Sequence, residues 1–102
     1  MNTKDRVRLD LNDPVFQRQW FALSKEDRLA VFSVLEKLAQ MTWDQIYRDK
    51  GLHWELIQQR HTPSGDRIYS LRITQKFRAT AQRSGEFLRM LTLHPDHDSA
   101  YH

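Results

Sequence analysis

The sequence predicts an α+β fold in which N-terminal helices pack on one face of a small, curved, mainly antiparallel sheet. Two patterns indicate this class. Apolar residues recur at helical spacing between residues 14 and 47, whereas segments after residue 67 alternate apolar and polar side chains, as strands do. A chain of 102 residues has the length of one domain, which we expect to span residues 1–102.

The first expected elements are a short strand and a helix. Residues 7–11 alternate apolar and polar side chains, which is typical of a half-buried strand. Residues 12–14, with the sequence NDP, supply a cap and a proline suited to a first helical turn. The helix that follows would carry three large apolar residues on one side: Phe16, Trp20 and Leu23.

Two more helices are expected before residue 52. Ser24 is followed three residues later by Asp27, a helix-start pattern, and the apolar stripe after it continues to about residue 40. Thr42 and Gln45 can form a capping box for a third, short helix, and Gly51 suits a left-handed stop after it. The residues expected to face the core are Val31, Phe32, Leu35, Leu38 and Ala39 of the long helix, and Trp43, Ile46 and Tyr47 of the short one.

Four strands are expected in the second half of the chain. Residues 53–60 have the composition of a strand, with a helix as the alternative, and residues 62–66 (TPSGD) form a turn. Two further turns, at residues 74–76 and 84–85, separate the last three strands.

The register of these three strands follows from the turns. Ala79 would lie opposite Leu71 on one side and opposite Met90 on the other. One face of the sheet is then apolar and able to cover the helices: Tyr69, Leu71, Ile73, Phe77, Ala79, Ala81, Leu88 and Met90. The other face carries Ser70, Arg72, Arg78, Thr80, Gln82 and Arg89.

Positive charge is concentrated in this part of the chain. The whole chain has a net charge of +3, whereas residues 60–89 alone hold seven Lys or Arg and two acids, a surplus of five. The seven cations are Arg60, Arg67, Arg72, Lys76, Arg78, Arg83 and Arg89. A polyanion such as RNA is one partner that fits this pattern. The alternative is a set of solvated strand surfaces kept soluble by charge.

Several classes of protein are excluded or disfavoured by composition. The chain has no cysteine, so it has neither disulfides nor thiolate metal sites. Its N-terminus is charged and lacks a signal-like apolar stretch, and nothing approaches the roughly 20 apolar residues of a membrane span. We therefore expect a soluble cytoplasmic protein with no membrane partner.

Four short motifs resemble the RelE/ParE-type toxins of bacterial type II toxin–antitoxin systems. They are YSLRIT at residues 69–74, KFRATA at residues 76–81, SGEF at residues 84–87 and LHPDHDSAY at residues 93–101. The resemblance implies a toxin that cleaves messenger RNA, often on the ribosome, and that is held inactive by a cognate antitoxin protein wrapped around it. A related class poisons DNA gyrase instead of cleaving RNA.

RNA cleavage without a metal needs a base, an acid and cations that stabilise the charged phosphate. Arg78 matches the arginine that follows an aromatic residue at the start of the family's central strand, and Arg72 on the same face could be a second phosphate ligand. His97 and Tyr101 match the family's C-terminal proton-transfer groups, and Asp96 or Asp98 could orient His97. Glu55 is a further candidate general base.

Three more cations, Lys76, Arg83 and Arg89, are expected to contribute to RNA binding. The tail also contains residue types that bind metals, namely His94, Asp96, His97, Asp98 and His102. Their spacing matches no closed zinc pattern, so we expect no metal and no cofactor. Two alternatives stay open: a ParE-like toxin that is not an enzyme, and a degenerate family member that only binds an antitoxin or nucleic acid.

Overall fold

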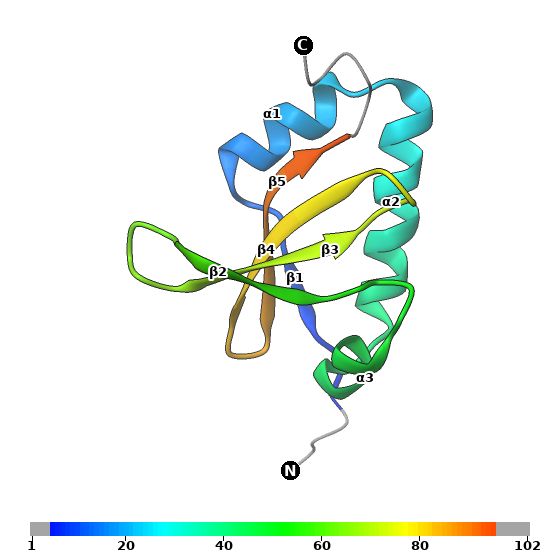
Figure 1. Cartoon of the computed structure of the whole chain (residues 1–102). Helices are drawn as coiled ribbons and strands as arrows, with labels where there is room; N and C mark the ends of the chain where they lie inside the picture. Colours follow the sequence, from blue (N-terminus) through cyan, green and yellow to red (C-terminus); the bar gives the residue numbers. More distant parts are fainter. Residues whose placement is uncertain (1–4, 96–102) are drawn as a thin grey trace.

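The computed structural model describes residues 5–95, which form an α+β fold with one open mixed sheet. The described elements are β1 (Arg8–Asp10), α1 (Pro14–Ala22), α2 (Lys25–Ala39), α3 (Trp43–Arg48), β2 (Glu55–His61), β3 (Arg67–Arg72), β4 (Arg78–Ser84) and β5 (Phe87–His94). The strand order is β1-β5-β4-β3-β2, with β1 parallel to β5 and the other neighbours antiparallel. In Figure 1, α2 runs along one side of the sheet and the β2–β3 hairpin projects on the other. No helix within residues 5–95 is long and apolar enough to cross a membrane.

The three helices begin where their capping residues predict. The Asp13 carboxylate accepts hydrogen bonds from the backbone N–H groups of Val15 and Phe16. The Ser24 hydroxyl accepts one from Asp27 N, and Thr42 forms the expected capping box with Gln45. These bonds satisfy backbone donors that have no partner inside the first turn of a helix.

Removing the cap of α1 tests its contribution to stability. Asp13→Ala should lower the free energy of unfolding by about 1 kcal/mol, because two N–H groups lose their acceptor. Asp13→Asn is the matched control, since asparagine caps helices about as well as aspartate. Chemical denaturation measures both variants, and equal losses for the two would contradict a capping role.

The core lies between the helices and one face of the sheet, as the alternation predicts. The expected apolar face is buried or, for Tyr69, packed against the buried cluster. The helices contribute Phe16, Val31, Leu35, Leu38 and Ile46 to the same cluster. Trp54 joins them and stacks on Tyr69 with ring centroids 4.8 Å apart.

The predicted register between β3 and β4 is confirmed, but the predicted register between β4 and β5 is wrong. The hairpin turn falls at Gly85 and Glu86, one residue later than expected, because Ser84 still pairs with Phe87. Gly85 has a φ of +61°, a conformation that suits glycine at the first position of a tight turn. Ala81 consequently lies opposite Met90, and Ala79 lies opposite Leu93.

Three local expectations are also wrong. Phe32 is 49% exposed and Tyr47 is 47% exposed, although both were expected to face the core. Gly51 does not adopt a left-handed conformation; in that turn His53 does, with a φ of 52°. β2 begins at Glu55, two residues later than expected, and contains an irregularity near Gln59, whose φ is 65°.

Candidate nucleic-acid interface

Two arginines and a histidine form a row across three strands on the sheet face opposite the helices. Arg72 of β3 pairs directly with Arg78 of β4, and Arg78 pairs directly with His94 of β5. Side chains at directly paired positions lie on the same face of a sheet, with Cβ atoms roughly 5 Å apart. We call this surface the arginine face; its residues are Ser70, Arg72, Arg78, Thr80, Thr92 and His94.

A bulge brings His94 onto this face. Leu88 and Met90 are buried on the helix side, and β5 continued without interruption would turn His94 to that side as well. The register shifts between Thr80 and Ala81, however, so Leu93 becomes the next buried residue of β5. His94 therefore points to the side of Arg78.

Hydroxyl groups hold the His94 ring in place. The Nε2 atom of His94 lies 2.7 Å from Thr92 Oγ1, and Thr92 Oγ1 is hydrogen-bonded in turn to Thr80 Oγ1. Thr80 is the better buried partner, with 6% of its surface exposed. Nε2 is thus occupied within the sheet, whereas Nδ1 has no hydrogen-bond partner among residues 5–95 and is the ring nitrogen that a ligand can contact.

The surroundings of His94 favour its neutral form. Partial burial of the ring lowers the pKa of His94 below its usual value of 6.5, and the positive charge of Arg60 lowers this pKa further. Arg60 lies near the end of β2, so β2 contributes a cation to the surroundings of His94. A neutral imidazole near neutral pH can accept a proton.

This lowered pKa predicts a pH-dependent stability. As the pH falls below 6.5, the imidazole of the unfolded chain takes up a proton before that of the folded chain, so the free energy of unfolding decreases. His94→Asn removes this contribution. The free energy of unfolding of both proteins is measured at about pH 8 and about pH 5. Between these two values the wild type should lose more stability than the variant. A difference independent of pH would contradict the environment described for His94.

Two arginines of the arginine face, and the nearby Arg60 of β2, lack acidic partners within residues 5–95. No carboxylate in this range forms an ion pair with Arg60, Arg72 or Arg78. The Nε atom of Arg72 is also buried without a hydrogen-bond partner in the described chain. A buried donor without a partner costs folding free energy, and an anionic ligand placed on this face would pair with the charge of the guanidinium groups.

Glu55 lies on the same face but is engaged elsewhere. It pairs with Ser70, which pairs with Thr80, so it shares a cross-strand row with Thr80 and not with Arg78. Its Oε2 atom lies 3.1 Å from His53 Nε2. Two strands, β3 and β4, therefore lie between Glu55 and the strand of His94, and Glu55 has a partner of its own.

The remaining predicted RNA ligands are spread over different surfaces. Lys76 is exposed in the turn between β3 and β4, two residues before Arg78 in sequence. Arg89 lies on the sheet side predicted for it, away from the buried Leu88 and Met90, but opposite Gln82 instead of Thr80, and its Nη2 atom is 3.7 Å from an Asp13 carboxylate oxygen. Arg83 lies on the helix side of β4, where its guanidinium covers Trp43 at 4.5 Å from the ring centroid. The structure thus separates Arg83 from the arginine face.

The tail candidates His97 and Tyr101 lie outside the described residues, as do Asp96, Asp98 and His102. His94 alone of the tail's expected metal-binding residue types is described. Within residues 5–95, no three His, Asp or Glu side chains gather closely enough to hold a metal ion.

Comparisons of the chain with protein-family models, with curated proteins and with solved structures give no match. The functional argument therefore depends on the geometry of the arginine face and on the motifs of the sequence.

Proposed function

We propose that this chain is the toxin of a type II toxin–antitoxin system, a RelE-like endoribonuclease that cleaves messenger RNA without a metal. The observation that carries the proposal is the direct cross-strand pairing of Arg72, Arg78 and His94. A phosphate held by the two guanidinium groups would lie beside an imidazole that is neutral near neutral pH.

The two arginines would stabilise the phosphate as its charge increases. During cleavage the ribose 2′-oxygen attacks phosphorus, and the intermediate carries more negative charge than the substrate. The two arginine side chains start from directly paired positions of the sheet, so both guanidinium groups can meet the same phosphate as that charge develops. Their planar forks also match phosphate oxygens better than lysine does.

His94 fits the role of general base. Its Nδ1 atom would accept the proton of the 2′-hydroxyl while Nε2 stays bonded to Thr92. The bond from phosphorus to the 5′-oxygen then breaks, leaving a 2′,3′-cyclic phosphate on one product and a 5′-hydroxyl on the other. An acid must protonate the departing 5′-oxygen, a role that the family resemblance gives to Tyr101 or His97.

The partners follow from the same resemblance. We expect a cognate antitoxin to bind the chain and to suppress its activity. The cations that lack acidic partners within residues 5–95 are compatible with RNA as the second partner.

Incubating the purified chain with labelled RNA in EDTA tests the activity, with and without added ribosomes. The proposal predicts fragments that end in 2′,3′-cyclic phosphate and begin with a 5′-hydroxyl. Binding of RNA without cleavage under both conditions would overturn the enzymatic proposal in favour of a nucleic-acid-binding role. Absence of both binding and cleavage would overturn the assignment of RNA as the ligand.

A further inference from the structure

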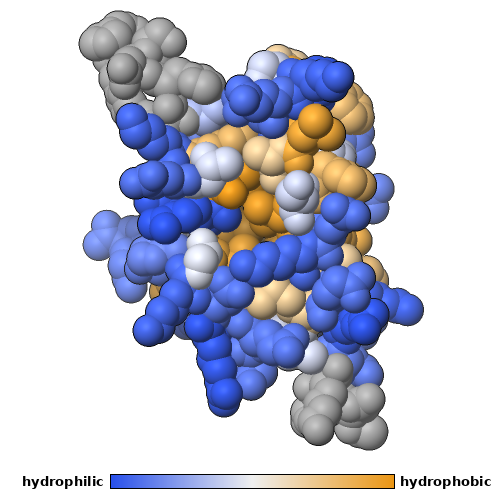
Figure 2. All heavy atoms as spheres, turned by 90° about the vertical axis from the view of Figure 1, so that its right-hand side faces the viewer, coloured by the Kyte–Doolittle hydropathy of each residue, from blue (hydrophilic) through white to orange (hydrophobic). Residues whose placement is uncertain are grey.

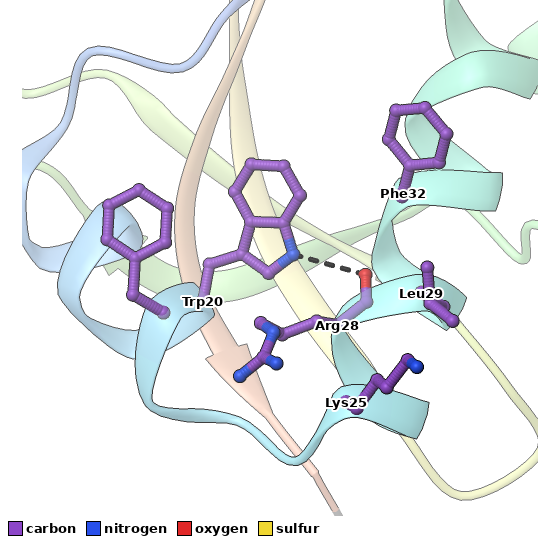
Figure 3. Close-up of a pocket in the computed structure, with 6 residues that line it drawn as sticks. Trp20, Lys25, Arg28, Leu29 and Phe32 are labelled. Carbon is purple, nitrogen blue, oxygen red and sulfur yellow. Dashed lines mark hydrogen bonds between the residues drawn. The ribbon is translucent and has the colours of Figure 1, made fainter.

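A groove of about 600 Å³ lies between α1 and α2. Six residues line it: Trp20, Phe21, Lys25, Arg28, Leu29 and Phe32 (Figure 3). We call it the α1–α2 groove. Figure 2, which views the molecule from the side of α2, shows a hydrophobic area framed by hydrophilic residues. The core face of the sheet lies beneath the helices, so the sheet separates the groove from the arginine face.

The groove exposes large apolar side chains that the fold leaves in water. Phe21 is 67% exposed, Leu29 is 54% exposed and Phe32 is 49% exposed. Single exposed apolar residues are common, but three that line one groove form a contiguous surface of the kind that marks a binding site.

Hydrogen bonds and ring packing within the protein hold the Trp20 and Arg28 side chains of the groove in place. Trp20 Nε1 donates a hydrogen bond of 3.2 Å to the Arg28 carbonyl, and the Arg28 guanidinium donates one of 2.7 Å to the Leu23 carbonyl. The Trp20 ring also packs against the fully buried Phe16, with ring centroids 5.6 Å apart. A binding partner would therefore lose little affinity to ordering this surface.

The positive charge beside the groove indicates which kind of partner can bind there. Lys25 and Arg28 line the groove, and neither forms an ion pair with a carboxylate in residues 5–95. A second copy of this chain, docked groove to groove about a two-fold axis, would set these cations against their own copies. An acidic partner instead matches them. Leu29 and Phe32 are one helical turn apart, a spacing that suits the apolar face of a helix lying along α2.

We propose that the α1–α2 groove binds an acidic amphipathic helix of a partner protein. Its apolar residues contact Phe21, Leu29 and Phe32, and its carboxylates pair with Lys25 and Arg28. The groove is a protein-docking surface distinct from the arginine face, so its variants leave RNA binding unchanged.

Two designed peptides of roughly 18 residues, about five helical turns, test the proposal by calorimetric titration. They share one leucine face and differ only in carrying glutamate or lysine beside it. The acidic peptide should bind at least about tenfold more tightly than the basic one, and more weakly as salt increases. Leu29→Glu should abolish binding, and Phe21→Ala, at a side chain that packs little in the fold, should weaken it. The double variant Lys25→Glu, Arg28→Glu should reverse the preference.

Other outcomes overturn the proposal. Equal affinity for both peptides, no binding at about 1 mM acidic peptide, or binding that survives Leu29→Glu would exclude an acidic helix in this groove. Concentration-dependent dimerisation that Leu29→Glu abolishes, measured by sedimentation, would assign the groove to a second copy of the chain. RNA that displaces the acidic peptide would assign it to nucleic acid.

Discussion

Arg78→Ala is expected to reduce the rate of RNA cleavage by at least about 100-fold, the usual cost of removing one fixed group that stabilises transition-state charge. Arg78 stands at the centre of the row, paired with Arg72 on one side and His94 on the other. Arg78→Lys should recover only part of the rate, because an ammonium group lacks the planar fork of guanidinium. Single-turnover cleavage of a labelled RNA measures these effects apart from product release.

Arg83→Ala is the matched comparison for Arg78→Ala. Both arginines belong to β4, but Arg83 lies on the helix side and covers Trp43. Its loss should leave the cleavage rate unchanged and cost only a modest amount of stability. Equal losses of rate for the two variants would mean that the arginine face is not where the phosphate binds.

Phe16→Ala is expected to lower the free energy of unfolding by about 3–5 kcal/mol, the largest stability effect among the substitutions considered. Phe16 is completely buried in the cluster that joins the helices to the sheet. Its loss leaves a cavity that the surrounding strands can fill only in part.

Phe21→Ala on the same helix provides the control for Phe16→Ala. Phe21 is 67% exposed, so its removal should change the free energy of unfolding by no more than about 0.5 kcal/mol. Urea denaturation measures both variants. A similar cost for Phe16→Ala and Phe21→Ala would contradict the described packing of α1 against the sheet.

The fold class and the apolar sheet face could be predicted because both depend on short-range periodicity. The hairpin turn lies one residue later than predicted, which shifts the pairing of β4 with β5 by two positions as far as Ala81, and the bulge adds one more position beyond it. A change of two positions keeps every side chain on its face, since side chains alternate with a period of two. Leu88 and Met90 are therefore buried as predicted, although their partners differ.

The composition of the arginine face could be predicted only in part. The positions of Arg72 and Arg78 follow from the alternation of side chains. The same alternation places Arg83 on the apolar side with Ala79 and Ala81, although its positive charge suggested that it belongs with the other arginines. His94 requires the bulge in β5, because an uninterrupted strand would turn it away. The change of apolar spacing from Met90 to Leu93 was the available signal for this bulge.

Exposure of Phe32 and Tyr47 could not be predicted from helical spacing. Spacing gives the direction in which a side chain points, but not how far the neighbouring layer extends. Phe32 lies beyond the edge of the core and lines the α1–α2 groove instead.

The most direct test is to map the RNA-binding surface by NMR, using an RNA whose 2′-hydroxyls are methylated so that it cannot be cleaved. We predict that chemical shift changes are concentrated on the arginine face, at Arg72, Arg78, Thr92 and His94, with none at Leu29 and Phe32. Changes confined to the α1–α2 groove, or no changes at all, would contradict the assignment of RNA to the arginine face.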